Sequence, residues 1–152
     1  MKYYLTIIVF LFVVTSCSKK VTYNQVESTP NVSSVQANSS DDGGTIILES
    51  SGSGQTFREA QNEAIKAAFR AILFIGVPGT AYRNPMIPNA EESQKSNQIF
   101  YEEFFNVKYS DFVMNVTELK SGNKDARIRV KINCNSLRMY LESKKIIRKL
   151  GY

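Results

Sequence analysis

The strongest pattern in this sequence lies between Thr56 and Gly76, where small apolar residues recur at the spacing of one helix face. Thr56 stands three residues before Glu59, and this pair has the form of a capping box that begins a helix. Gly76 is suited to end the helix, and Pro78 prevents its resumption. The recurring residues are mostly alanine: Ala60, Ala64, Ala67, Ala68, Ala71, Ile72 and Ile75. We therefore predict a helix that lies unusually close to the sheet it covers.

Three further segments have the composition of β-strands. Residues 45–49 are mainly aliphatic, and residues 109–119 and 126–134 flank a Ser-Gly-Asn turn at 121–123. Apolar and polar residues alternate strictly along 126–134, which is typical of a strand with one buried and one solvated face. The two segments around the turn therefore predict an antiparallel hairpin.

Two more helices complete the predicted domain. Residues 90–105 gather apolar and aromatic side chains, and a last helix is expected to begin near residue 135. Residues 77–89 contain three prolines and predict a loop between the first two helices. The fold class that follows is α+β, with a small antiparallel sheet of three strands covered by two or three helices.

The composition is that of one ordinary globular domain, and it excludes several kinds of enzyme. The chain has 152 residues, of which 43% are apolar and 22% are charged. It has no histidine and two cysteines, which excludes a Ser-His-Asp relay, a Cys-His dyad and a histidine-rich metal site. The net charge of +5 suits acidic surfaces but falls short of a dedicated nucleic-acid binder. We expect no catalytic residue, no metal or cofactor, and no nucleic acid as a partner.

The N-terminal residues have the composition of an export signal. Lys2 supplies a positive charge, residues 5–14 form an almost unbroken apolar run, and the small residues Thr15 and Ser16 follow. An apolar run of about ten residues is roughly half the length that a transmembrane helix needs. The segment therefore predicts a signal peptide rather than a membrane span.

Cys17 follows directly, and residues 14–17, with the sequence Val-Thr-Ser-Cys, resemble the lipobox of bacterial lipoproteins. The resemblance implies that residues 1–16 are removed and that the sulfur of Cys17 is acylated, which holds a protein to a bilayer essentially permanently. Ser18 at the next position implies transfer to the outer membrane, with the folded domain in the periplasm. The alternative is an ordinary secretory signal whose cleavage site adjoins a cysteine.

The residues after Cys17 are predicted to form a tether. Residues 18–43 are rich in Ser, Asn, Thr and Gly and show no helical period, so they cannot bury a core. We predict a signal peptide over 1–16, the lipidated cysteine with a flexible tether over 17–43, and an α+β domain over 44–152. The membrane is thus an expected partner through the N-terminal lipid.

A row of cations on the predicted strand 126–134 is the main candidate contact site. Arg127, Arg129 and Lys131 alternate with apolar residues and therefore share the solvated face. They are candidate contacts for a partner or an anion, with uncharged neighbours such as Asn115 and Thr117 on the other arm. The alternative is a solvated face that discourages aggregation at the sheet edge.

A cysteine and a pair of glycines could suggest a reactive thiol and a nucleotide-binding loop, but the sequence favours a structural role for each. Cys134 is in phase with the apolar side of its strand, which predicts a small buried side chain without a disulfide partner. Gly52 and Gly54 resemble the start of a dinucleotide-binding fingerprint, but Phe57 occupies the place of the third glycine. We interpret these glycines as a turn.

The order of a strand, a Ser-Gly-Ser-Gly turn and an alanine-rich helix is similar to small periplasmic α+β modules of the flagellar T-ring assembly protein and of short outer-membrane lipoproteins. The aromatic segment 82–105 departs from those modules. The resemblance implies a non-catalytic envelope domain that packs against other envelope proteins. The alternatives are a glycan-processing hydrolase that uses two carboxylates from distant parts of the chain, and a module that binds glycan or anions through the cationic row.

Overall fold

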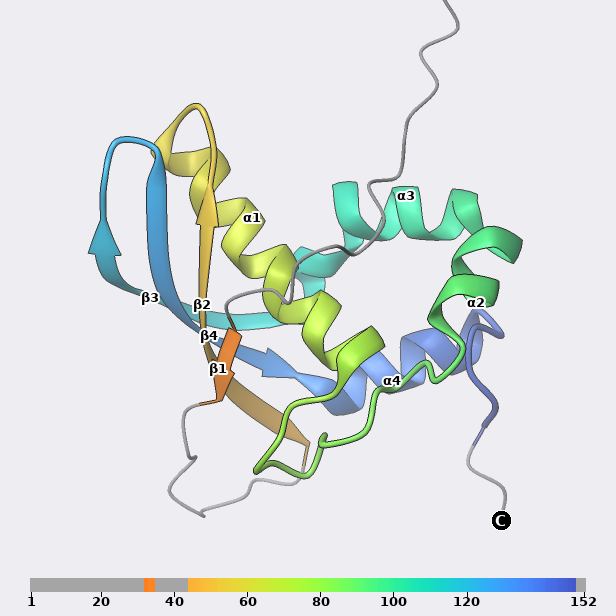
Figure 1. Ribbon diagram of the computed structural model, residues 1–152. Helices are drawn as coiled ribbons and strands as arrows, with labels where there is room; N and C mark the ends of the chain where they lie inside the picture. The colour runs from red at the N-terminus through yellow and green to blue at the C-terminus, as the bar shows by residue number, and fades with distance from the viewer. Residues whose placement is uncertain (1–31, 35–43, 150–152) are drawn as a thin grey trace, which may run out of the picture.

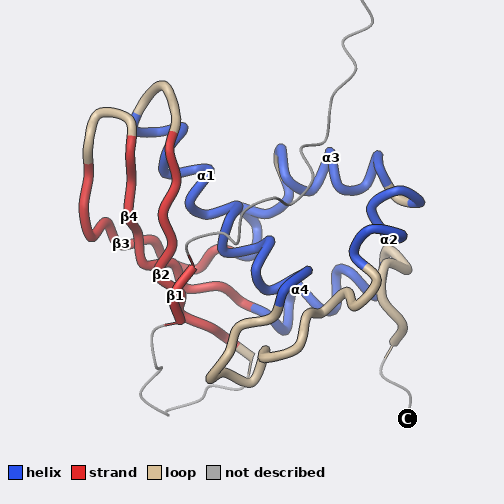
Figure 2. Tube along the Cα trace, viewed as in Figure 1, coloured by secondary structure: helices blue, strands red, loops and turns tan. Residues whose placement is uncertain are grey.

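The computed structural model describes residues 32–34 and 44–149. Over these ranges the chain forms an antiparallel sheet with helices on one side of it (Figures 1 and 2). The elements, in chain order, are β1 (Val32–Ser34), β2 (Thr45–Ser53), α1 (Phe57–Arg70), the π-helical turn η1 (Ala71–Ile75), α2 (Ala90–Ser96), α3 (Gln98–Asn106), the 3₁₀ helix η2 (Lys108–Phe112), β3 (Val113–Ser121), β4 (Asp125–Asn133) and α4 (Cys134–Ser143). The predicted signal peptide and Cys17 lie outside the described residues.

The sheet confirms the predicted α+β class and the antiparallel hairpin. Its strand order is β1-β2-β4-β3, so β4 lies between two long neighbours. β2 pairs with β4 along its whole length, from Thr45 opposite Asn133 to Ser53 opposite Asp125. β3 pairs with the other side of β4 and contains two irregularities in register.

The three long strands were predicted, but β2 runs four residues beyond the expected range 45–49. The interpretation of Gly52 as a turn residue is wrong, because it lies within β2 opposite Ala126. β1, which falls within the predicted tether, adds a short fourth strand beside β2.

α1 begins at the predicted capping box and lies as close to the sheet as its alanines suggest. The Glu59 N–H donates to Thr56 Oγ1 at 3.3 Å, and the Thr56 N–H donates to the Glu59 carboxylate at 3.3 Å. A Cβ atom added to Gly52 of β2 would stand 2.3 Å from the backbone N of Ala64 and 2.5 Å from the backbone O of Ala60. A residue with a side chain does not fit at this position without moving the helix.

The last turn of the predicted first helix is η1, and the proline-rich loop holds it in place. Gly76 ends the turn with a φ of 86°, in the left-handed region that favours glycine. The carbonyl oxygens of Ile72 and Leu73 accept hydrogen bonds from two amides of the loop, at 3.1 and 2.9 Å. These bonds satisfy carbonyls at the helix end and fix residues 77–89 against the core.

The single helix predicted over 90–105 is wrong, because α2 and α3 are separate helices that meet at Asn97. The backbone of Asn97 is not helical, with φ −128° and ψ 39°. Its side-chain amide donates to the carbonyl oxygen of Ser93 at 3.0 Å and so competes with the backbone for that acceptor. α3 buries Tyr101 and Phe104, whereas α2 buries no residue. Packing against the core therefore does not hold α2 on the same axis as α3.

The strand predicted from residue 109 begins later, because residues 108–112 form η2. Tyr109 and Phe112 are both buried, with 8% and 7% of their surface exposed. Residues three apart point to opposite faces of a strand but to one face of a 3₁₀ helix. Burying both rings against one core therefore requires the helix.

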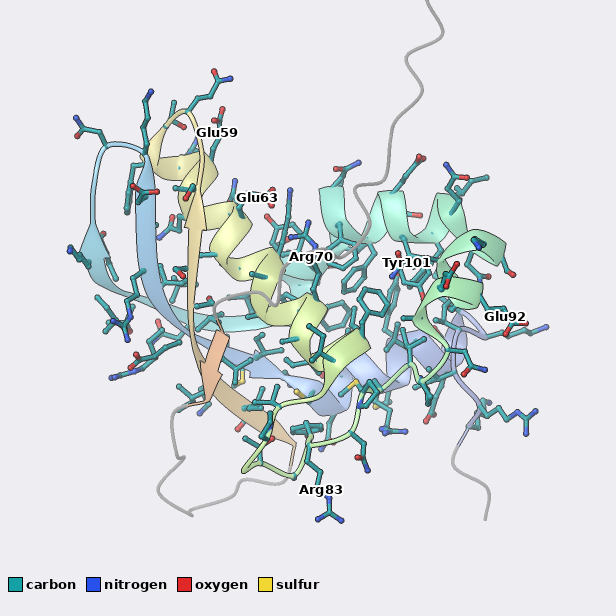
Figure 3. All side chains as sticks on the ribbon, in the orientation of Figure 1. Glu59, Glu63, Arg70, Arg83, Glu92 and Tyr101 are labelled. Atoms are coloured by element: carbon teal, nitrogen blue, oxygen red, sulfur yellow. The ribbon has the colours of Figure 1, made fainter. Side chains whose placement is uncertain are left out.

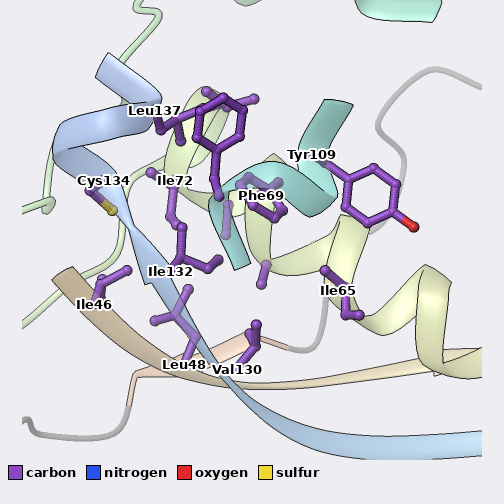
Figure 4. Close-up of a cluster of buried hydrophobic side chains, with 14 of the residues drawn as sticks. Ile46, Leu48, Ile65, Phe69, Ile72, Tyr109, Val130, Ile132, Cys134 and Leu137 are labelled. Carbon is purple, nitrogen blue, oxygen red and sulfur yellow. The ribbon is translucent and has the colours of Figure 1, made fainter. Parts of the chain in front are cut away.

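One cluster of buried side chains fills the space between the sheet and the helices (Figure 4). Phe69 of α1 lies at its centre and contacts the ring of Phe104 edge to face, with centroids 5.8 Å apart. Leu137 of α4 and Ile132 of β4 are fully buried in the same cluster. In the aromatic segment 82–105, Tyr101 and Phe104 are therefore core residues, and the other three rings are partly buried against the core. Of the helices within the described ranges, none is long and apolar enough to span a bilayer.

Candidate functional site

The cationic row predicted on β4 lies on the face of the sheet that is turned away from the helices. The intervening residues Ile128 and Val130 are fully buried on the helix side. Arg127 and Arg129 are exposed, and Lys131 is half-buried. Over the residues that the structure describes, no helix covers the face that carries this row (Figure 1).

The register of the sheet places the cationic row between two flanking columns, one on β2 and one on β3. Each cation of β4 has one partner on either side. The three rows across the strands are Ile47, Lys131 and Asn115; Glu49, Arg129 and Thr117; and Ser51, Arg127 and Lys120. The predicted positions of Asn115 and Thr117 beside the cations are confirmed. We call these nine residues the cationic face.

Glu49 joins the two arginines of the cationic face. Its carboxylate accepts a hydrogen bond from Arg129 Nη2 at 2.7 Å and another from Arg127 Nη2 at 3.0 Å. The Glu49 side chain is 16% exposed, while those of the arginines are 43% and 58% exposed. The hydrogen bond from Arg129, together with the bond from Arg127 and the charges of both arginines, holds the pKa of Glu49 below its ordinary value against the opposing effect of desolvation. The carboxylate therefore fixes both guanidinium groups and offsets part of their charge.

Two lysines give the cationic face its surplus of charge. Lys120 and Lys131 form no ion pair with any residue that the structure describes. The nine residues thus contain four cations and the one carboxylate of Glu49. They include no aromatic ring, so a base has no stacking platform here.

Cys134 belongs to the core, as predicted, and not to a reactive site. Its side chain is 1% exposed, and burial raises the pKa of the Cys134 thiol to about 12, against a smaller opposite effect of a hydrogen bond with Tyr82. A thiol with this pKa is neutral at pH 7 and is a poor nucleophile. Only Cys17 remains as the expected site of covalent chemistry, and it lies outside the described residues.

Two shallow hollows lie away from the cationic face. The one beside the start of α1 contains a single acidic side chain, Glu118. The one beside α2 contains Glu91 and Glu92, which are consecutive on a helix and therefore diverge. Glu91 is also paired with Lys95 at 2.7 Å. Within the described ranges, no cluster of three His, Cys, Asp or Glu side chains is placed to hold a metal ion.

Among the charged members of the cationic face, Glu49 and Lys120 were not predicted from the sequence. Alternation with Leu48 indicates that Glu49 faces outward, but no local signal tells which residue of β4 lies opposite it. Lys120 follows the second register shift of β3, between residues 118 and 120. That bulge turns Lys120 outward, whereas simple alternation from Thr117 places it on the inner face.

Comparisons of this chain with family models, with curated proteins and with solved structures find no match. The lipobox resemblance and the resemblance to the flagellar T-ring module therefore stay predictions.

Proposed function

We propose that this chain is a lipid-anchored protein of the outer membrane whose periplasmic domain works as a non-catalytic binding or assembly module. Cys17 is the proposed site of acylation. The cationic face is the proposed docking surface, and its partner is an acidic surface of another envelope protein. The observation that carries the proposal is a sheet face that no described helix covers and on which Glu49 already holds two arginines in fixed positions.

The arrangement of the arginines lowers the cost of binding. A free arginine side chain loses about 0.5 to 1.5 kcal/mol of rotamer freedom when an interface immobilises it. Arg127 and Arg129 are already held by Glu49. A guanidinium group has five N–H donors, so each arginine keeps donors for a partner's carboxylates. Complementary charge then raises the rate and specificity of encounter.

The shape of the face suits a protein better than a small anion. Three neighbouring strands span about 10 Å, and three rows spaced two residues apart span about 14 Å. Neither of the two hollows described above contains a residue of the cationic row. Small ligands bind in concave sites that enclose most of their surface, whereas proteins dock across many side chains of a surface.

The anchor supplies the second part of the mechanism. Acylation confines the domain to the same membrane as its partner, which raises their effective concentration and lets weak contacts suffice. The 15 residues from Cys17 to Asn31 reach at most about 50 Å when fully extended, which sets the distance at which the domain can act.

Site-specific photo-cross-linking in intact envelopes tests the docking surface. A cross-linker at Thr117, within the cationic face, is expected to give a discrete protein adduct, while one at Ser136 on α4 is not. Arg129→Glu is expected to abolish the adduct, and Arg58→Glu on the exposed side of α1 is the matched charge reversal. Equal adducts from both cross-linker positions contradict the proposed surface.

Incorporation of labelled fatty acid tests the anchor. The wild-type chain is expected to incorporate the label, and Cys17→Ser is expected to lose it and to remain uncleaved or soluble. Label retained by Cys17→Ser rejects Cys17 as the lipidation site.

A second candidate function is recognition of glycan or lipid phosphate by the cationic face. It is favoured by Lys120 and Lys131, which have no ion-pair partner among the described residues. Under this alternative, purified cell-wall glycan pulls down the wild-type protein, and Lys120→Gln/Lys131→Gln abolishes that pull-down. The cross-linker at Thr117 then gives no protein adduct even in the otherwise wild-type chain.

A further inference from the structure

The end of α4 leads into a basic segment that is held firmly against the domain. The Ile146 N–H donates to the carbonyl oxygen of Leu141 at 2.9 Å, and the Lys145 N–H donates to that of Glu142 at 3.1 Å. The helix is capped by Lys144, so the first bond joins the second residue after the cap to the third residue before it. The second bond joins the first residue after the cap to the second residue before it. This pair of bonds is a Schellman motif. The motif reverses the chain and starts the segment of residues 144–149.

Lys145 occupies the position of this motif that normally belongs to glycine. Its φ is 60°, and it is the only residue other than glycine with a positive φ among the described residues. The left-handed conformation strains a residue that has a side chain, and glycine adopts it freely. The chain thus presents a lysine where local stability favours glycine.

Two isoleucines between the cations fix the orientation of the segment. Ile146 and Ile147 are partly buried and pack against the core cluster. The four basic side chains on either side of them are exposed: Lys144, Lys145, Arg148 and Lys149. An apolar pair turned inward therefore directs two pairs of cations outward.

The cations of this segment are not neutralised within the domain. No ion pair joins any of the four to an acidic side chain in the described part of the chain. Lys144 Nζ lies 5.7 Å from the centre of the Tyr140 ring, which leaves its positive charge intact. Glu142, the nearest acid in the sequence, pairs with Arg138 at 3.8 Å.

We infer that residues 144–149 bind the phosphate groups of anionic lipids at the surface of the membrane to which the chain is anchored. The inference rests on the membrane anchor of the proposed function, but it does not depend on the docking role of the cationic face. Each cation near an anionic bilayer raises partitioning roughly five-fold, and the effects multiply. Lysine provides mobile point charges that suit a fluid layer of headgroups. The segment contains no aromatic ring on which a nucleic-acid base could stack.

Vesicle co-sedimentation of the full chain carrying Cys17→Ser tests the inference, because this background removes the acyl anchor. We compare vesicles of phosphatidylcholine alone with vesicles that also contain phosphatidylglycerol. The expected result is stronger binding to the anionic vesicles that is lost at about 0.5 M salt. Lys144→Gln/Arg148→Gln/Lys149→Gln is expected to lower that preference roughly a hundred-fold.

A matched charge control distinguishes this segment from a general basic surface. Arg58→Gln/Arg83→Gln/Lys124→Gln removes the same number of exposed charges outside both this segment and the cationic face, and it is expected to leave the preference for anionic vesicles largely unchanged. An equal loss in both triple variants overturns the inference. Competition by inorganic phosphate beyond that of chloride at equal ionic strength, or equally tight binding of duplex DNA, also overturns it.

Lys145→Gly provides a variant in which stability and binding move in opposite directions. The strain at this position predicts that its Tm rises by a few degrees while its preference for anionic vesicles falls roughly five-fold. An unchanged preference in this more stable variant contradicts a lipid role for Lys145. Label incorporation at Cys17 in the otherwise wild-type chain is scored separately, so failure of the anchor and failure of this segment are distinguishable.

Discussion

The two faces of the sheet differ in what their side chains contact, although alternate residues of the same strands form both. On the inner face, Ile128, Val130 and Ile132 of β4 have no exposed surface. On the outer face, the alternate residues Arg127 and Arg129 are exposed and are held by a carboxylate of β2. Packing on the inner face depends on side-chain volume and close contact. The ion pairs of the outer face depend on charge and on the register of the strands.

This difference separates what folds the domain from what is available for binding. Figure 3 shows charged side chains such as Glu59 and Arg83 at the periphery, while Tyr101 lies among the rings between the helices. Substitutions on the inner face are expected to change stability, and those on the outer face are expected to change binding.

The largest effect is expected on the inner face of β4. Ile128→Ala removes a fully buried side chain and leaves a cavity, which should lower the free energy of unfolding by about 2 to 5 kcal/mol. Lys131→Ala, on the outer face of the same strand, should change it by no more than about 0.5 kcal/mol. Chemical denaturation measures both, and similar losses would contradict the separation of the two faces.

A smaller effect is expected where α1 approaches β2. Gly52→Ala places a methyl group against the helix backbone and should destabilise the fold by about 1 to 3 kcal/mol. Gly122→Ala is the matched control, because the nearest atom to its added Cβ is 3.5 Å away and no steric cost is expected. Unfolding of Gly52→Ala at the same denaturant concentration as the wild type would contradict the close contact between α1 and β2.

The smallest effect is expected from the ion pairs of the outer face, and it depends on pH. The pKa of Glu49 is lower in the folded protein than its ordinary value of 4.5. Its contribution to stability is therefore complete above pH 4.5 and is lost as the pH falls through the folded pKa. Glu49→Gln has no such titration, so its stability should decline less than that of the wild type between pH 6 and pH 3.

Unfolding curves at several pH values measure this difference. Asp111→Asn, which changes an exposed side chain of η2 outside the cationic face, serves as the control for loss of one acid. Identical pH dependence in Glu49→Gln and the wild type would show that the two arginines do not hold the carboxylate in solution.

Local signals were sufficient where neighbours in the sequence settle the structure. The capping box of Thr56 and Glu59, the terminating Gly76 and the alternation along β4 each predicted an element that the structure contains. They were not sufficient at Asn97, whose side-chain amide competes for the Ser93 carbonyl and divides a predicted helix. They failed where distant contacts decide, because Tyr109 and Phe112 form a 3₁₀ helix in place of a predicted strand so that both rings reach one core.

The sequence by itself determined the elements, the polarity of the two sheet faces and the close approach of α1, because those follow from spacing along the chain. It also placed Arg127, Arg129 and Lys131 together, since alternate residues of a strand share a face. Only the tertiary structure decided that Glu49 would lie between the two arginines and that Lys120 would join them. Strand register and bulges set those contacts, and both depend on how the whole sheet packs against its helices.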